Sequence, residues 1–370
     1  MGAELTGNER WSYSRGVMHP RPRILRKSRF ALAGWIVVGL VVIGAMGRYA
    51  IFKLVEHDAF ITPPAGSLTP DALGTPSIQL SFQRGAHVLR ASHVAARDDD
   101  APALLIFHGD EEELSRWAAV QSYLHPFGVA SFVFDYSGYG ASTGRPTIDG
   151  LKRDDEAAYA RFVAATPGAK RRYVLGYSLG SAVLLDVVGR LRPAPDGVIL
   201  AAGFASAREM AVTTGLVPGW AAWILPDVWN NEAQVAELRQ PLLIVHSTDD
   251  ELIPFAHAQR VCAAAKASGR LVAIESLSHD APLGPLAAEA FWRPVIDLLR
   301  SGELPCRDAK ANGLLQLQPE RHSMSGRQAK AWGCLQPAGA IVPKRSTTRT
   351  VRWTGHWKTS GKCAVSAAGR

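Results

Sequence analysis

The chain has 370 residues, of which 47% are hydrophobic, and a formal net charge of +8. The positive charge lies at the two ends. Residues 1–53 carry nine Lys and Arg against two Asp and Glu, residues 301–370 carry twelve against three, and residues 54–300 carry twenty against twenty-eight. A nucleic-acid-binding domain needs basic residues clustered on a folded face, so the acidic middle of the chain argues against one.

The N-terminal part of the chain predicts a membrane anchor. A basic segment, residues 1–29, is followed by 18 uncharged and largely apolar positions at residues 30–47. As a helix this run would extend about 27 Å, against a hydrocarbon core of about 30 Å. Five basic residues directly precede the run, and only Arg48 and Lys53 follow it. This bias favours a single-pass protein with a cytoplasmic N-terminus and the folded body on the opposite side of the membrane. A cleaved signal peptide and a buried helix are the alternatives.

The pattern after the anchor predicts an α/β domain. Residues 48–76 are expected to link the anchor to a domain over residues 77–300, because 54–75 are rich in Pro and Gly. Alternating segments at 78–82 and 87–93 predict an antiparallel hairpin. Short continuous apolar runs, typical of strands buried on both faces, follow at 103–107, 129–134, 173–175, 198–201, 242–245 and 271–274. Segments of helical length lie at 148–165, 180–190, 255–268 and 285–299. Such alternation predicts a mostly parallel central sheet with helices on both faces.

Two regions fall outside this strand–helix pattern. Residues 203–240 contain Trp220, Trp223 and Trp229 between two predicted strands. They form either a packed excursion with ordinary core aromatics or a cap that brings the tryptophans over an apolar pocket. Residues 301–370 are basic, lack helical or strand periodicity and are predicted to be disordered. An out-of-frame extension would have the same composition.

The residues Gly176-Tyr177-Ser178-Leu179-Gly180 form a G-x-S-x-G motif between a predicted strand and a predicted helix. In a nucleophile elbow the serine occupies a tight strand-to-helix turn with unusual backbone angles, and glycines remove side chains that would clash there. The serine Oγ then lies at the helix N-terminus, where the helix dipole favours developing negative charge. Ser178 is therefore the predicted nucleophile, and the alternative is a Gly-rich turn with an idle serine.

A serine nucleophile needs a base, and three histidines lie between Ser178 and residue 300. His246 ends a predicted strand, and His257 lies inside a predicted helix. His279 lies in a loop after the last predicted strand, from which a side chain can reach the carboxyl edge of the sheet. In sequences with this motif the base follows the acid along the chain, so His279 is the predicted base.

The acid and the oxyanion hole are expected in two other loops. A carboxylate after the strand at 242–245 can hold the imidazole in the correct tautomer, and Asp250 is preferred there over Asp249. The oxyanion hole needs two backbone N–H groups. One is expected from Leu179, and the other from Asp110 in the turn that follows the strand at 103–107.

These motifs resemble the α/β-hydrolase superfamily over roughly residues 77–300, and are most similar to the Bem46-like, membrane-anchored serine hydrolases. The resemblance is carried by His108-Gly109, by DYSGYGASTGRP at 135–146, by the elbow at 176–180, by HSTDDELIP at 246–254 and by Ser278-His279-Asp280. It implies a triad of Ser178, Asp250 and His279, with the acid on Asp250. Asp110 stands where Asn is usual and Ser247 where Gly is usual, but neither replaces a reacting side chain.

The motifs and the resemblance together predict a serine hydrolase that cleaves acyl esters, thioesters or lipid-like acyl substrates through an acyl-Ser178 intermediate. A membrane-anchored serine peptidase and a non-catalytic binding protein of the same fold are the alternatives. The expected partners are a small-molecule or lipid-like substrate and, through residues 30–47, the membrane, but not nucleic acid. The four cysteines have no CxxC spacing and no cluster of ligand residues occurs, so we expect neither a metal nor a cofactor.

Overall fold

The computed structural model describes residues 24–265, 268–284, 288–305 and 365–368. The chain divides into two units, Met1–Ile51 and Phe52–Arg370. Most of the predicted disordered tail lies outside the described residues, so disorder there stays a prediction.

The first unit contains most of helix α1 (Ile24–Asp58), and this helix includes the predicted anchor at residues 30–47. Among the described residues, α1 is the helix that is long and apolar enough to cross a membrane, by length and composition. The helix continues through the start of the predicted linker to Asp58. It does so because residues 48–62 contain neither Pro nor Gly to interrupt it.

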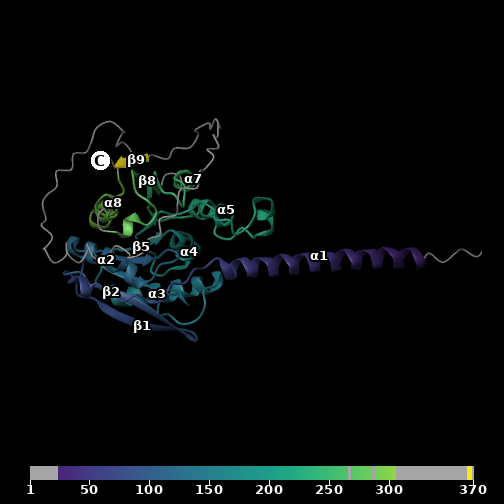
Figure 1. Ribbon diagram of the computed structural model, residues 1–370, viewed down its shortest axis with the longest axis horizontal. Helices are drawn as coiled ribbons and strands as arrows, with labels where there is room; N and C mark the ends of the chain where they lie inside the picture. The colour runs from purple at the N-terminus through teal and green to yellow at the C-terminus, as the bar shows by residue number, and fades with distance from the viewer. Residues whose placement is uncertain (1–23, 266–267, 285–287, 306–364, 369–370) are drawn as a thin grey trace, which may run out of the picture. The chain divides into compact units, whose positions relative to one another are not determined.

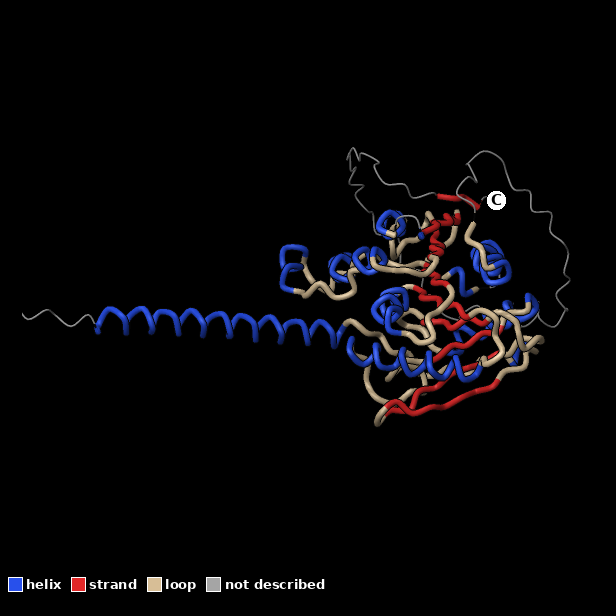
Figure 2. Tube along the Cα trace, turned by 180° about the vertical axis from the view of Figure 1, so that it is seen from behind, coloured by secondary structure: helices blue, strands red, loops and turns tan. Residues whose placement is uncertain are grey.

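The second unit is built on a sheet with the strand order β1-β2-β4-β3-β5-β6-β7-β8-β9. Strands β1 and β2 form an antiparallel hairpin, β2 pairs antiparallel with β4, and the other pairings are parallel. Figure 2 shows the strands in red. Their bounds are β1 Ile78–Arg84, β2 His87–Val94, β3 Ala103–Phe107, β4 Ala130–Phe134, β5 Arg172–Tyr177, β6 Gly197–Ala201, β7 Leu242–Ser247, β8 Gly269–Ile274 and β9 Val365–Ala368.

Helices cover both faces of this sheet (Figure 1). One buried cluster joins Leu104 to Trp117 of α2 and Trp292 of α8, whereas the next residue of the same strand, Leu105, belongs to a second cluster with α3, α4 and α7. The helices are α2 Leu114–Leu124, α3 Ile148–Ala165, α4 Leu179–Val187, α5 Ala207–Thr213, α6 Asn231–Ala236, α7 Ala256–Ala264 and α8 Ala288–Ser301. The 3-10 helices are η1 Asp71–Leu73, η2 His125–Phe127, η3 Val188–Arg190, η4 Gly219–Ile224 and η6 Ala281–Leu283.

The structure confirms the predicted α/β fold. The hairpin and all six predicted inner strands are present, with small differences at their ends. Their apolar runs are continuous because α2 and α8 cover one face and α3, α4 and α7 cover the other. The sequence did not predict β9, which pairs with β8 at the sheet edge, because a four-residue segment is too short to carry a periodic signal.

Candidate active site

Ser178 lies at the sharp turn between β5 and α4, with φ 51° and ψ −118°. This conformation is strained for a residue with a side chain. A Cβ atom at Gly176 would lie 2.5 Å from the Gly180 carbonyl oxygen, and one at Gly180 would lie 2.0 Å from the Phe107 carbonyl oxygen. The turn therefore requires both glycines of the motif, as expected for a nucleophile elbow.

The structure brings Ser178, His279 and Asp250 together in one hydrogen-bonded chain. His279 Nε2 lies 3.0 Å from Ser178 Oγ, and His279 Nδ1 lies 2.8 Å from Asp250 Oδ2. All three side chains are largely buried. The chain is continuous from the serine to the carboxylate, which is the arrangement that lets a histidine accept the serine proton.

The surrounding backbone fixes the positions of the acid and the base. Asp250 Oδ1 accepts the N–H groups of Leu252, at 3.0 Å, and Ile253, at 2.7 Å. The backbone N–H of His279 donates to Glu251 Oε2 at 3.0 Å, and its carbonyl oxygen accepts the Tyr177 hydroxyl. Both side chains are thus held before a substrate arrives, which reduces the cost of orienting them during the reaction.

The pKa values of the acid and base move in the directions that such a pair requires. Burial alone lowers the pKa of His279, but the hydrogen bond to Asp250 and the charge of that carboxylate outweigh it, so the pKa lies above the ordinary 6.5. Burial alone raises the pKa of Asp250, but the hydrogen bond and charge of His279 outweigh it and the pKa is lowered. Asp250 is therefore a carboxylate near neutral pH.

The residues left open as alternatives have other partners. Asp249 accepts the Ser276 N–H at 2.7 Å and the Thr248 hydroxyl at 2.9 Å, so it holds the loop before His279. His257 Nδ1 accepts the Ala205 N–H at 3.1 Å. His246 Nε2 donates to the Ile253 carbonyl oxygen at 2.8 Å, within the acid loop. Neither histidine occupies the position of His279 beside Ser178.

The turn after β3 lies against the nucleophile, where the second oxyanion donor is expected. A Cβ atom at Gly109 would lie 3.2 Å from Ser178 Cβ. Glu112 Oε2 holds this turn by accepting the Gly109 N–H and the Trp117 indole N–H, each at 2.8 Å. Burial raises the pKa of Glu112 to about 7. The turn is thus fixed beside the position that Leu179 occupies at the start of α4.

The side chain of Asp110 connects this turn to the segment that follows α1. Its two carboxylate oxygens lie 3.1 and 3.2 Å from the Ile61 nitrogen, whose N–H they accept, and Oδ1 also accepts the Tyr139 hydroxyl at 2.5 Å. Burial raises the pKa of Asp110 to about 6. Sequence reasoning missed Ile61, Tyr139 and the role of Glu112. The run of four acidic residues at 110–113 shows that hydrogen-bond donors are needed at this turn, but not which residues supply them.

The three tryptophans of residues 203–240 lie in different environments, and a cap over the active site stays a hypothesis. The side chains of Trp220 and Trp223 are 79% and 70% exposed. Only Trp229 is buried, and its ring meets the edge of Phe60 at a centroid distance of 6.2 Å. Counting tryptophans could not distinguish these environments, because the surface that covers each ring comes from distant parts of the chain.

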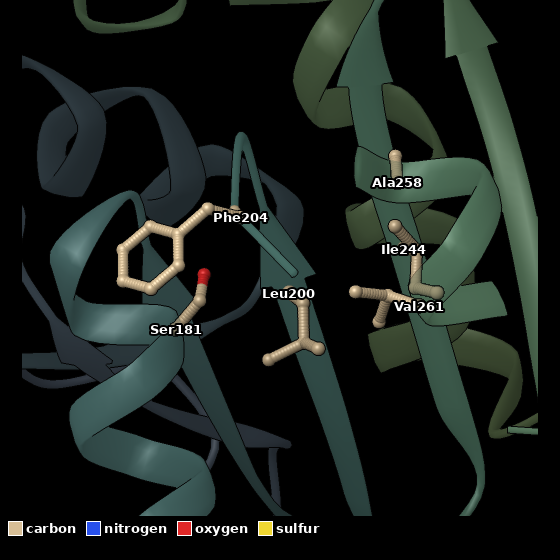
Figure 3. Close-up of a pocket in the computed structure, with 7 residues that line it drawn as sticks. Ser181, Leu200, Phe204, Ile244, Ala258 and Val261 are labelled. Atoms are coloured by element: carbon tan, nitrogen blue, oxygen red, sulfur yellow. The ribbon is translucent and has the colours of Figure 1, made fainter. Parts of the chain in front are cut away.

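A small cavity lies between α4, β6, β7 and α7 (Figure 3). Its volume of about 10 Å³ holds no more than one water. It is therefore a packing gap and not a site for an acyl chain. Its lining residues are Ser181, Leu200, Gly203, Phe204, Ile244, Ala258 and Val261. In the part of the chain that the structure describes, no group of three His, Cys, Asp or Glu side chains is arranged to hold a metal ion.

Comparison with known proteins identifies the family. Residues 99–233 match the hydrolase family model described as serine aminopeptidase, S33. An uncharacterized protein of Mycobacterium tuberculosis is 30% identical over 251 residues, covering 66% of this chain and 88% of that protein. An uncharacterized membrane protein of Saccharomyces cerevisiae is 24% identical over 62% of this chain and 82% of its own length.

Two further matches extend the comparison. Lysophosphatidylserine lipase ABHD12 of Xenopus tropicalis is 32% identical over 42% of this chain and 44% of its own length. The structure of the Pyrococcus furiosus esterase Pf2001 superposes with a TM-score of 0.52 at 17% identity, covering 65% of this chain and 97% of that one, and shows the same fold. The apolar helix α1 and the yeast membrane relative together suggest membrane association. The chain is a hydrolase that belongs to the α/β-hydrolase superfamily.

Proposed function

We propose that this chain is a membrane-anchored serine hydrolase that cleaves acyl esters through a covalent acyl-Ser178 intermediate. The observation that carries the proposal is the continuous hydrogen-bonded chain from Ser178 through His279 to Asp250 at a strained elbow. A protein without catalytic activity does not need Ser178, His279 and Asp250 to be aligned for proton transfer. This geometry therefore argues against a non-catalytic binding protein.

The proposed reaction has two halves. Ser178 Oγ attacks the acyl carbon while His279 Nε2 takes its proton, and Asp250 stabilises the imidazolium that forms. The N–H groups of Leu179 and Asp110 are proposed to hold the oxyanion. His279 then returns the proton to the leaving alkoxide, which departs as an alcohol. In the second half His279 takes a proton from water and the resulting hydroxide attacks the acyl carbon. The bond from that carbon to Ser178 Oγ then breaks, His279 returns the proton to Oγ, and the carboxylic acid leaves.

Lipid-like acyl esters are the proposed substrates, since ABHD12 is named as a lysophosphatidylserine lipase and helix α1 is long enough to span a bilayer. A serine peptidase is the second candidate, because the matching family model is described as a serine aminopeptidase. An aminopeptidase must bind the substrate ammonium group with an acidic side chain. Three acidic side chains around the site, Asp110, Glu112 and Glu251, already accept backbone N–H groups, which favours the ester.

Kinetics on matched esters and amides separate these two candidates. For the full chain in detergent, kcat/KM on p-nitrophenyl esters should exceed that on aminoacyl p-nitroanilides. It should also rise with acyl length by no more than about fourfold per methylene, the equivalent of about 0.8 kcal/mol. The S178A variant supplies the background rate. A rate that is flat or falls from acetate onward, together with efficient amide cleavage, would favour the peptidase.

The proposed topology places the N-terminus in the cytoplasm and the hydrolase domain on the opposite side of the membrane. Five basic residues before the span at 30–47, against two after it, support this orientation. A reporter that is active only outside the cytoplasm, fused after residue 300, should therefore be active. Cytoplasmic reporter activity, or release of the body by carbonate washing, would contradict the proposal.

A further inference from the structure

The segment between β6 and β7, the excursion of residues 203–240, carries two exposed tryptophans on one face. Trp220 and Trp223 lie three residues apart in the 3-10 helix η4. Because a 3-10 helix has three residues per turn, residues i and i+3 lie on the same side of it. Their side chains are 79% and 70% exposed, more than any other large apolar side chain that the structure describes outside α1. An apolar face of this kind marks an interaction surface.

The exposed face belongs to a segment that has a small hydrophobic cluster of its own. Ala211, Val217, Ala221 and Leu225 form a small buried cluster of their own, separate from the core on either side of the sheet. The Val217 N–H donates to the Ala211 carbonyl oxygen at 2.9 Å, and Arg208 Nη2 donates to the Leu225 carbonyl oxygen at 3.0 Å. Since Ala221 points into this cluster, the tryptophans on either side of it in η4 are kept at the surface.

The chain that follows the predicted span packs against the same excursion. Val55 contacts the small cluster, and Phe60 contacts Trp229. Val55 follows the end of the predicted span at residue 47 by eight residues, which is about 12 Å of helix. The contact between Val55 and the excursion therefore lies only eight residues along the chain from the proposed span. Tryptophan is enriched at the membrane–water interface, where its ring is apolar and its N–H stays hydrated.

The excursion also begins beside the candidate nucleophile. The Ser178 N–H donates to the Ala201 carbonyl oxygen at 2.9 Å, at the end of β6 where the excursion starts. We propose that the excursion docks on the phospholipid surface through Trp220 and Trp223, and so gives the hydrolase body a second membrane contact on the segment that leaves β6 beside Ser178. This inference rests on the proposed membrane span of residues 30–47.

Photolabelling from the lipid tests the docking directly. The full chain is reconstituted in vesicles of palmitoyl-oleoyl phosphatidylcholine containing a little phosphatidylcholine with a diazirine in its acyl chain, irradiated, digested and mapped by mass spectrometry. Lipid adducts are expected both on the span at 30–47 and on the segment 216–226. Adducts on the span alone would overturn the docking and leave the proposed anchor intact. Adducts on neither segment would overturn both.

Two variants sharpen this result. The double variant W220S/W223S should lose the adducts on 216–226 and keep those on the span, whereas I78S, which removes an exposed apolar residue from β1, should keep both sets. Both variants should still react with a fluorophosphonate in detergent, which shows that they are folded. If the segment carries no lipid adducts and W220S/W223S dissolves a dimer of the wild type, the face binds a second copy and the proposal is wrong.

Discussion

Replacing Ser178 by alanine should lower kcat for ester hydrolysis by about a million-fold, to the level that binding and oxyanion contacts alone support. The reason is that Ser178 Oγ is the one atom of the proposed triad that forms a bond to the substrate. His279 Nε2, 3.0 Å from that oxygen, would then have no serine proton to accept. The loss should appear in kcat with p-nitrophenyl butyrate at saturating concentration.

A buried serine nearby supplies the control for this substitution. Ser181 lies in α4, one turn after the elbow, and its hydroxyl donates to the Gly176 carbonyl oxygen at 2.8 Å. S181A removes the same atom from the same helix without touching the proposed reacting groups. It should therefore keep most of the activity. Comparable losses in S178A and S181A would point to damage of the elbow and not to loss of a nucleophile.

Replacing Asp250 by asparagine should lower kcat by about 10⁴-fold, because an amide in place of the carboxylate no longer stabilises the imidazolium or holds the correct tautomer of His279. Asp249 is the matched control, since it is adjacent and bonded to Ser276 and Thr248, not to His279. D249N should keep activity close to that of the wild type. A larger loss in D249N than in D250N would assign the acid to Asp249 and contradict the account.

The pH profile separates this role of Asp250 from a structural one. The active form of His279 is the neutral imidazole, so kcat/KM should fall as the pH falls through its pKa, which lies above 6.5 in the wild type. D250N removes the hydrogen bond and charge that raise this pKa, while burial continues to lower it. The acidic limb of the residual activity should therefore move to lower pH. An unchanged limb would mean that Asp250 does not act through His279.

Local signals in the sequence predicted most of the sheet and the elbow. Each inner strand is apolar on both faces, so its run of residues is visible without knowledge of its neighbours. The elbow is equally local, because Gly176 and Gly180 are required by backbone contacts at 2.5 and 2.0 Å around the turn. The preference for Asp250 over Asp249 came from a motif, and the 2.8 Å contact with His279 agrees with that preference.

Features that depend on distant partners could not be predicted. Asp110 stands where asparagine is usual, and the neighbouring sequence does not show which groups its carboxylate contacts. Its side chain accepts the N–H of Ile61 and the hydroxyl of Tyr139, two donors from segments far away in the chain. In the same way, Trp229 is buried because Phe60 packs against it, whereas no part of the described chain buries Trp220. Pairings of this kind have no local sequence signal.

Ser178 is proposed to form a covalent bond with the substrate acyl group, and a fluorophosphonate reports this bond formation most directly. The full chain is treated with the reagent in detergent, digested, and analysed by mass spectrometry to locate and quantify the phosphonyl group. We expect one adduct per chain, located on Ser178, and none in S178A under the same conditions. Equal labelling of S178A, or a wild-type adduct on another residue, would contradict the proposal.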